Sequence, residues 1–305
     1  MFAKLTILNV LLMSIMDEWL IPAKTFLVGE YVALDHGPAI IITTTPHFKL
    51  RLTTDSINTQ AIHPQSPAGR FWATYHNLDK FLSWEDPYHA IGGLGASSAQ
   101  FLGAFFANCT LLNIKPELNA LLETYYKYSW HGKGPRPSGY DLLAQAQAQC
   151  VYINLQHQII QIYPWVFSEL DFILIYTGTK LITHQYLESI PIPQTITNLI
   201  PIVNNTIAAF EHRDSQKLID SVTAYQQQLT ASQLTTPQSV QNLKTLLKNQ
   251  KILAAKGCGA MGADILLLLI AAADRESILH TLTDAGWMII ACSQNLCQTE
   301  PMVER

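Results

Sequence analysis

Hydrophobic and polar positions fall into short segments that predict a mixed chain of strands and helices. Alternating or brief apolar runs indicate strands, and apolar residues at helical spacing indicate helices. Strands are predicted at 25–28, 39–45, 48–53, 151–154, 159–163, 172–176, 265–270 and 287–292. Helices are predicted at 100–112, 118–128, 142–149, 196–211, 216–229, 240–249 and 275–285. The turn residues at 35–38 separate the first two strands.

The order of these elements predicts an α+β fold with two domains. Strands cluster before helices instead of alternating with them, which disfavours a doubly wound parallel sheet. We expect a boundary near 164–170, with domains at 16–167 and 168–305. Six consecutive aliphatic residues at 265–270 lie between Asp264 and Asp274, too close for a membrane span of about 20 residues, so they predict a buried strand.

Composition narrows the function further. Hydrophobic residues make up 49% of the 305 positions and charged residues 14%, which is typical of a globular protein with a substantial core. A net charge of -4 argues against nucleic-acid binding. Five cysteines without a CxxC pair fit free thiols in a reducing cytoplasm. We expect a cytoplasmic monomer or homodimer with no membrane partner, in which the apolar residues 1–15 are a leader of unknown role.

The segment at 93–100 has the properties of a phosphate-binding loop. Its glycines allow a close approach of the backbone to an anion, its hydroxyls can reach a metal, and a helical pattern follows directly. Unpaired N–H groups at a helix start attract phosphate. The Walker pattern GxxxxGK[ST] is absent. The predicted nucleotide-binding residues are Gly93, Leu94, Gly95, Ala96, Ser97 and Ser98.

Three further segments carry chemistry, although each also has an ordinary structural interpretation. Lys24 and Glu30 lie in 22–31, where a solvated strand-end charge is the alternative. Asp141 closes the cation-bearing loop 131–141, where a helix cap is the alternative. Small residues fill 256–264, where the alternative is a tight turn into the next strand.

Taken together, the four segments resemble the motifs of the GHMP kinase family, which includes galactokinases, homoserine kinases, mevalonate kinases and phosphomevalonate kinases. The resemblance spans about 22–287. It rests on Pro22, Lys24, Gly29, Glu30 and Tyr31; on Gly93, Leu94, Gly95, Ser97 and Ala99; on Pro137, Ser138, Gly139 and Asp141; and on Gly259, Ala260, Gly262 and Asp264. The implied architecture is a ribosomal protein S5 domain 2-like N-terminal domain followed by a ferredoxin-like C-terminal domain.

The resemblance implies a phosphotransferase that uses ATP and Mg²⁺. It assigns the ATP phosphates to the backbone of 93–98, the Mg²⁺ to Ser97, the acceptor hydroxyl to Asp141, and charge stabilisation to Lys24, which it places beside Asp141. The residues that the resemblance assigns to the acceptor are Glu30, Tyr31, Lys133, Arg136, Ser138, Gly139, Gly259, Ala260, Met261, Lys180 and His184. The cations among them suit an acceptor that carries a phosphate or a carboxylate.

Some positions depart from the family pattern. Ala96 stands where the family often has a serine. Met261 and Ala263 replace glycines, and we expect the methionine to crowd the approach to the substrate or phosphate. Mevalonate kinases usually carry a metal-binding glutamate before the aspartate segment, and Glu123 stands at the wrong spacing. The metal is therefore expected to depend on Ser97 and the nucleotide phosphates.

The acceptor stays open between two members of the isoprenoid mevalonate pathway. Tyr31, Asp264 and the Gly-Lys at 132–133 favour phosphomevalonate kinases. His131, followed by the Pro-Ser-Gly at 137–139, and the short chain favour mevalonate kinases. We prefer phosphomevalonate. A homologue that binds nucleotide and ligand without catalysis, and a structural protein that reuses the fold, are the alternatives of other classes.

Overall fold

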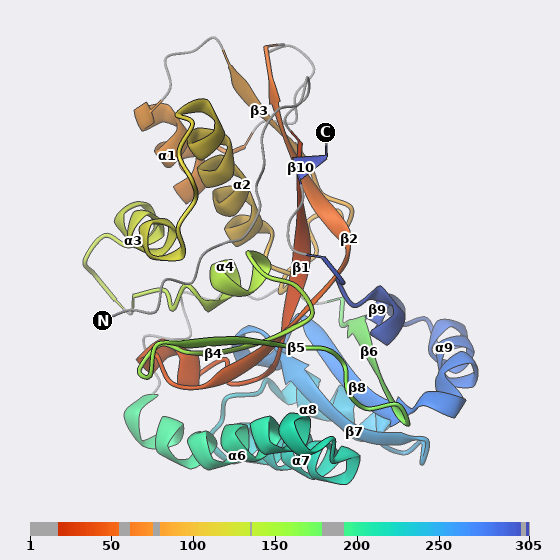
Figure 1. Cartoon of the computed structure of the whole chain (residues 1–305). Coiled ribbons are helices and arrows are strands. Elements are labelled where there is room, and N and C mark those ends of the chain that lie inside the picture. Colours follow the sequence, from red (N-terminus) through yellow and green to blue (C-terminus); the bar gives the residue numbers. More distant parts are fainter. Residues whose placement is uncertain are drawn as a thin grey trace.

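The fold has two antiparallel sheets, with helices packed against each (Figure 1). It is seen in a computed structural model that describes residues 18–54, 62–75, 80–134, 136–178, 192–299 and 303–304. This arrangement confirms the predicted α+β class. No helix in these ranges is long and apolar enough to cross a bilayer.

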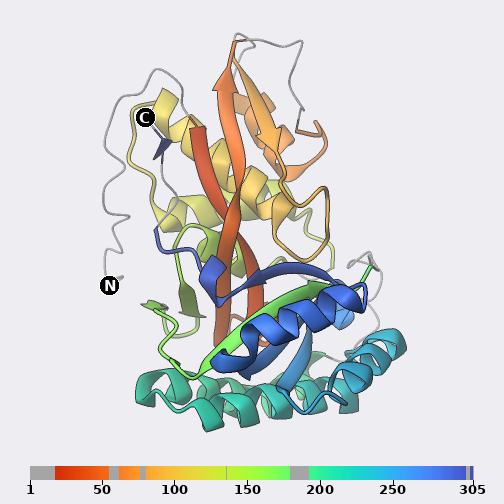
Figure 2. The same cartoon turned by 90° about the vertical axis from the view of Figure 1, so that its right-hand side faces the viewer.

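The first sheet is built around two long strands that extend from the upper part of the molecule toward the second sheet (Figures 1 and 2). Its order is β10-β1-β2-β4-β5, and β3 pairs with the far end of β2. The strands are β1 (Glu18–Val28), β2 (Ala39–Thr53), β3 (Phe81–Glu85), β4 (Cys150–Asn154), β5 (Ile159–Tyr163) and β10 (Val303–Glu304). The helices α1 (Pro67–Tyr75), α2 (Ala96–Leu111), α3 (Leu118–Ser129) and α4 (Tyr140–Gln145) lie on one side of β1 and β2.

Helix α2 is the centre of this half. Eleven of its sixteen residues are buried, which explains why its sequence is apolar on nearly every face. Phe101 packs against Phe71 with ring centroids 5.3 Å apart. On the sheet side, Phe48 stacks on Trp84 at 5.2 Å. Helix α2 itself packs closely on β1 and β2, since a Cβ at Gly103 would lie 3.0 Å from Ile21 Cδ1 and 2.9 Å from Leu50 Cδ1. This packing positions the N-terminus of α2 and the loop before it.

The second sheet has the order β7-β8-β6-β9. Its strands are β6 (Leu170–Tyr176), β7 (Ile252–Cys258), β8 (Ile265–Ala271) and β9 (Met288–Cys292), and its helices are α6 (Ile192–His212), α7 (Ser215–Ala231), α8 (Pro237–Leu246) and α9 (Arg275–Asp284). The succession strand, helices, two strands, helix, strand is the ferredoxin-like pattern. Helices α6 and α7 run side by side along the lower edge in Figures 1 and 2.

The buried strand predicted at 265–270 is confirmed. Every residue of this run is fully buried, and alternate side chains enter two different cores. Leu267 and Leu269 join the main core, whereas Leu266 and Leu268 join a smaller core with residues of α8 and α9. Because successive side chains of a strand point to opposite faces, a continuous apolar run is what a strand covered on both faces requires.

Several predicted boundaries are wrong. Strand β1 begins at Glu18, so Lys24 lies inside the strand and does not open it. The segments predicted at 39–45 and 48–53 are one strand, β2. Helix α2 begins at Ala96, and α4 begins at Tyr140 and ends at Gln145. Helix α8 occupies 237–246 in place of the predicted 240–249. Elements α1, β3, β7 and β10 were not predicted.

The two halves are joined by buried polar contacts. Lys256 of β7 is fully buried, and its Nζ lies 3.2 Å from the Phe26 carbonyl oxygen and 2.8 Å from Glu30 Oε1. The end of the chain also returns to the first sheet, since Leu296 bridges to Thr44 and β10 pairs with β1. The predicted division at residue 168 did not include this return.

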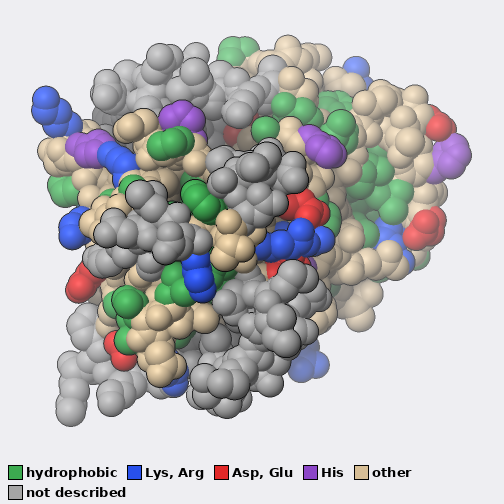
Figure 3. Space-filling model, turned by 90° about the horizontal axis from the view of Figure 1, so that it is seen from above, with side chains coloured by type: hydrophobic (Ala, Val, Ile, Leu, Met, Phe, Trp, Pro, Cys, Tyr) green, Lys and Arg blue, Asp and Glu red, His purple; other side chains and the backbone are tan. Residues whose placement is uncertain are grey.

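On the face seen in Figure 3, hydrophobic side chains are dispersed among polar ones.

Candidate active site

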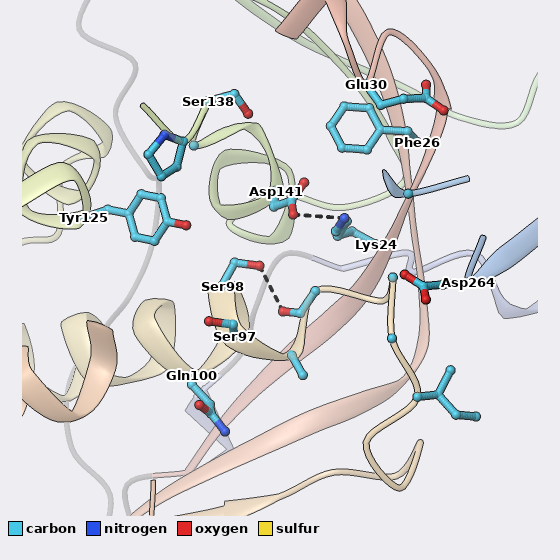
Figure 4. A pocket seen from close by; sticks show the side chains of 18 of the residues that line it. Lys24, Phe26, Glu30, Ser97, Ser98, Gln100, Tyr125, Ser138, Asp141 and Asp264 are labelled. Atoms are coloured by element: carbon cyan, nitrogen blue, oxygen red, sulfur yellow. Dashed lines mark hydrogen bonds and ion pairs between the residues drawn. The ribbon is translucent and has the colours of Figure 1, made fainter. Parts of the chain in front are cut away.

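All four motif segments reach one cavity of about 1040 Å³, as the sequence predicts (Figure 4). The predicted site residues that line it are Lys24, Glu30, Tyr31, Gly93, Gly95, Ala96, Ser97, Ser98, Lys133, Arg136, Ser138, Gly139, Asp141 and Gly259. They come from β1 and the turn after it, the start of α2, the loop before α4, and the end of β7. The cavity therefore lies where both sheets meet the helix layer.

Lys24 and Asp141 form an ion pair at the centre of this cavity. The Lys24 Nζ lies 2.9 Å from Asp141 Oδ2, and the two side chains point toward each other in Figure 4. The lysine side chain is 7% exposed and the aspartate 38%. Asp141 is the second residue of α4 and makes no capping bond, so the helix-cap alternative does not apply. The predicted proximity of the two residues is confirmed.

The loop before α2 has a backbone that only glycine adopts readily. Gly93 and Gly95 have φ values of 81° and 86°, in the left-handed region. Gly95 is the residue before the first turn of α2, and no side chain caps that turn within the described part of the chain. Because the first N–H groups of a helix have no intrahelical partner, this helix start is available to an anion in the cavity.

The two serines of the loop differ in exposure. Ser97 is exposed at the cavity, whereas Ser98 is buried. The Ser98 Oγ lies 2.7 Å from Gln145 Oε1 and 2.9 Å from the Gly95 carbonyl oxygen, so its hydroxyl holds the loop in shape. Of the two hydroxyls, that of Ser97 is therefore the one that is open to the cavity.

Gln145 of α4 ties the glycine loop to β1. Its side chain is fully buried, and its Nε2 donates to the Pro22 carbonyl oxygen at 2.8 Å and to that of Gly95 at 3.2 Å. The Lys24 backbone N–H donates to the Leu94 carbonyl oxygen at 3.0 Å. A Cβ at Gly95 would lie 2.8 Å from Lys24 Cγ. The absent side chain of Gly95 is therefore what lets the lysine pass beside the loop.

The late glycine motif also contributes a carboxylate to the cavity. Asp264 lines the cavity and is 5% exposed. It packs against the glycine loop so closely that a Cβ at Gly92 would lie 3.0 Å from its Oδ1. A Cβ at Gly259 would lie 3.4 Å from its Oδ2. Glycines in both segments thus permit the close approach between the late glycine motif and the glycine loop before α2.

A pre-oriented guanidinium also lines the cavity. The Arg136 Cζ lies 4.3 Å from the centroid of the Tyr126 ring, and one guanidinium nitrogen lies 2.8 Å from His36 Nε2. Burial first, and then the positive charge of Arg136, lowers the pKa of His36. A neutral His36 accepts a hydrogen bond from the guanidinium through Nε2. Lys133 lines the same cavity, so the region around Arg136 and Lys133 suits a ligand that carries a phosphate or a carboxylate.

Glu30 is held between the two halves of the molecule. Lys256 is buried, and although burial disfavours its charged form, the neighbouring Cys258 and Glu30 raise its pKa overall. The Lys256 Nζ also lies 5.6 Å from the centroid of the Tyr225 ring. The carboxylate that was predicted to bind the acceptor is therefore fixed in place by an ion pair across the domain contact.

Some predicted residues take other positions. Leu94 is fully buried, and Met261 is not among the residues that line the cavity, so the expected crowding by methionine is not observed. The side chain of Ala260 lies outside the described part of the chain. Tyr31 reaches the cavity, but its hydroxyl donates to the Leu234 carbonyl oxygen at 3.3 Å and accepts from the Met261 N–H at 3.1 Å. Lys180 and His184 lie outside the described residues.

Sequence reasoning also missed part of the lining. The missed residues include His63, Trp84, Asp86, His89, Gln100 and Tyr125. Asp86 accepts from the N–H groups of Tyr88 and Ala90, each at 2.8 Å, and this holds a turn in which His89 and Ala90 have positive φ. The available signal was the Asp86-Pro87 dipeptide, because an aspartate before a proline favours the start of a turn.

The donors in the cavity fit magnesium bound together with nucleotide. The described residues hold no group of three metal-ligating side chains, and Glu123 is exposed and does not line the cavity. The Ser97 hydroxyl is a hard oxygen ligand of the kind that Mg²⁺ prefers. Such an ion would take its remaining ligands from phosphate oxygens and water.

Solved kinases share this fold. The chain aligns with the Methanococcus jannaschii mevalonate kinase at a TM-score of 0.70 and 14% identity, over 92% of this chain and 98% of that one. It aligns with the Streptococcus pneumoniae phosphomevalonate kinase in complex with phosphomevalonate and AMPPNP at a TM-score of 0.71 and 18% identity, over 92% of this chain and 99% of that one. It aligns with the Lactococcus lactis galactokinase complexed with galactose at 0.70 and 11%, over 95% of each chain.

These alignments establish the architecture along nearly the whole chain, which has the fold of GHMP kinases. No protein-family model and no curated protein sequence matches it.

Proposed function

We propose that this protein is an ATP-dependent kinase that transfers the γ-phosphoryl group to an oxygen of a small molecule, with the phosphate of phosphomevalonate as the favoured acceptor. The observation that carries the proposal is the Lys24–Asp141 ion pair, which lies in the same cavity as the uncapped N-terminus of α2. Asp141 can take a proton, Lys24 can offset the negative charge of the transferred phosphate, and the N-terminus of α2 can hold the other phosphates.

The reaction follows from these positions. The α2 N-terminus and the loop at Gly93 and Gly95 hold the ATP phosphates. The acceptor oxygen, which is a phosphate oxygen in phosphomevalonate and the 5-hydroxyl oxygen in mevalonate, forms a bond to the γ-phosphorus. The bond from that phosphorus to the β,γ-bridging oxygen breaks, and ADP leaves. Asp141 accepts the proton that the acceptor group carries, or orients the acceptor oxygen. Lys24 offsets negative charge on the transferred group, because phosphoryl transfer depends mainly on positioning and charge stabilisation.

Magnesium fits this scheme as a partner of the nucleotide. When bound, it neutralises charge on the β- and γ-phosphate oxygens. Ser97 is the side chain that we assign to it, because its hydroxyl is exposed at the cavity whereas that of Ser98 is engaged.

An anionic acceptor is supported by Arg136 and Lys133. A guanidinium already stacked on Tyr126 and bonded to His36 loses little freedom when it binds phosphate. The Streptococcus pneumoniae kinase was solved with phosphomevalonate and AMPPNP, and the fold similarity makes that pair the first to test. Mevalonate is the second candidate, because its carboxylate suits the same cations and a mevalonate kinase has the same fold.

An assay of ADP release tests this proposal. The protein is incubated with MgATP and 5-phosphomevalonate, mevalonate, galactose or homoserine in turn. We expect turnover with 5-phosphomevalonate. Arg136→Lys, which keeps the charge but loses the planar fork, should raise the KM for this acceptor about tenfold and leave the KM for ATP unchanged. If no acceptor is turned over while MgATP still raises the melting temperature, the non-catalytic alternative is supported.

A further inference from the structure

Tyr125 of α3 is a polar group in the cavity to which the proposed mechanism gives no role. It lines the same cavity as Lys24, Ser97 and Asp141. In Figure 4 its hydroxyl points into the cavity, toward the space between Ser97 and Asp141. The neighbouring tyrosine, Tyr126, instead donates its hydroxyl to the Ser138 carbonyl oxygen at 2.9 Å and supports the loop before α4.

The position of the Tyr125 ring is fixed by its neighbours. It packs edge-on against Phe101 of α2, with centroids 5.1 Å apart and planes at 72°. The centroid of Tyr126 lies 6.3 Å away. Since Phe101 belongs to the buried helix that also carries Ser97, the phenol and the phosphate-binding loop are held on one rigid support. A group held in this way donates a hydrogen bond without losing much side-chain entropy.

The electrostatics keep this phenol protonated. Burial first, and then the negative charge of Asp141, raises the pKa of Tyr125, while hydrogen bonding with Ser129 one turn further along α3 opposes the rise. A neutral O–H therefore faces the reacting region over the whole physiological pH range. A neutral donor can bind an oxyanion without adding a second negative charge beside Asp141, as a carboxylate on α3 would.

We propose that the Tyr125 hydroxyl donates a hydrogen bond to an oxygen of the terminal phosphate of the bound nucleoside triphosphate. The inference rests on the proposed function, because it takes the cavity to be a nucleotide site. It makes Tyr125 a contact of the γ-phosphate, distinct from the loop at Gly93 and Gly95, which holds the phosphates common to ATP and ADP.

Binding of AMPPNP and of ADP, each with Mg²⁺, measured by titration calorimetry, tests this assignment without turnover. Tyr125→Phe removes only the hydroxyl. Because hydrogen bonds to charged groups are strong, we expect AMPPNP to bind about tenfold or more weakly, while ADP affinity stays within about twofold of the wild type. The melting temperature without nucleotide should not change, since the ring contacts with Phe101 remain.

Tyr128→Phe is the matched control. Tyr128 lies on the same helix, its ring packs on Phe71, and it does not line the cavity. This variant should bind both nucleotides as the wild type does. Unchanged AMPPNP affinity in Tyr125→Phe, or an equal loss for AMPPNP and ADP, would overturn the assignment to the γ-phosphate. If the wild type binds neither nucleotide, the proposed function fails, and this inference fails with it.

Discussion

The amine of Lys24, in the middle of β1, lies 2.9 Å from the carboxylate of Asp141, at the start of α4. The pair joins two elements that are more than a hundred residues apart in the sequence. The lysine is buried and its stem passes beside Gly95, whereas the aspartate keeps an exposed edge in the cavity. A ligand in the cavity can therefore reach the aspartate while the lysine holds that carboxylate in position.

Lys24→Met should lower turnover by about 100-fold or more, because a charge that stabilises the transition state is lost. We expect the affinity for MgATP to change much less, since the backbone of the α2 N-terminus still holds the phosphates. Lys49→Met is the control: Lys49 lies on β2, pairs with Glu85 at 3.3 Å and is partly exposed. Equal losses of turnover and nucleotide affinity for Lys24→Met would mean that the lysine only binds phosphate.

Gly95→Ala should weaken nucleotide binding and stability together. A Cβ there would lie 2.8 Å from both Gln145 Nε2 and Lys24 Cγ, and the residue would also adopt a φ of 86°. Gly286→Ala is a close control, since Gly286 has a φ of 82° and a Cβ there meets nothing within 4 Å. Both variants lose about 1–2 kcal/mol from the left-handed backbone.

Gly95→Ala should lose more stability than this backbone cost, whereas Gly286→Ala should not, because only a Cβ at Gly95 displaces Gln145 or Lys24. For the same reason, only Gly95→Ala should bind MgATP at least about tenfold more weakly. Urea unfolding and calorimetric titration measure the two effects. Matching results from both variants would show that the space beside Gly95 is not needed.

Lys256→Met should destabilise the fold by about 3–5 kcal/mol, because it leaves the buried carboxylate of Glu30 without its cation. Lys251→Met is the control: Lys251 pairs with Asp274 at 2.6 Å but is half exposed, so its loss should cost less than about 1 kcal/mol. Equilibrium unfolding in urea measures both. Similar losses for the two variants would contradict a structural role for the buried pair.

Stability should fall as pH rises above about 8.5, where thiols of the unfolded chain ionise. Burial raises the pKa of Cys109 to about 11 and raises that of Cys150 as well. The folded state therefore keeps protons that the unfolded state loses. The stability that each protonated thiol contributes is fully present below the pKa of the thiol in the unfolded chain. It is lost as pH rises toward and through the pKa of the thiol in the folded protein, by up to about 1.4 kcal/mol per pH unit for each thiol.

Urea unfolding at pH 7.5, 8.5 and 9.5 in the presence of a reductant tests this dependence. Cys109→Ala should reduce the slope, because one thiol no longer titrates on unfolding. A free energy of unfolding that stays level or rises over this range would contradict the burial of these cysteines.

The sequence predicted most helices and the buried strands, because their apolar patterns are long or regular. It predicted β1 poorly because Pro22 and Lys24 interrupt the run. The structure accommodates Pro22 at an irregularity where the register with β2 shifts between Ile21 and Ala23. Proline is tolerated at such bulges, which cannot be recognised from one strand alone.

Strand β7 was missed for a different reason. Its residues around Lys256 are alanine, glycine and a charged side chain, which have low strand propensity. They form a strand because β8 provides a partner and because Glu30 and the Phe26 carbonyl oxygen pair with the lysine. These contacts are long-range, so local pattern carries no sign of them.

The candidate site was predicted where a motif combines glycines with functional groups, and missed elsewhere. Lys24 and Asp141 were predicted to meet, and they do. Tyr125 and Asp86 lie on elements whose patterns indicate only packing or a turn, and they enter the cavity through tertiary arrangement. Met261 was expected to crowd the cavity, but its backbone at a φ of 56° belongs to the turn that bonds to Tyr31.

The most direct test of the account is the rate of ADP release with MgATP and 5-phosphomevalonate, compared between the wild type and Asp141→Asn. Asparagine keeps the size of the side chain but cannot take a proton. The account predicts turnover by the wild type and a loss of about 100-fold or more in the variant, with MgATP still bound. Turnover by Asp141→Asn close to that of the wild type would contradict it.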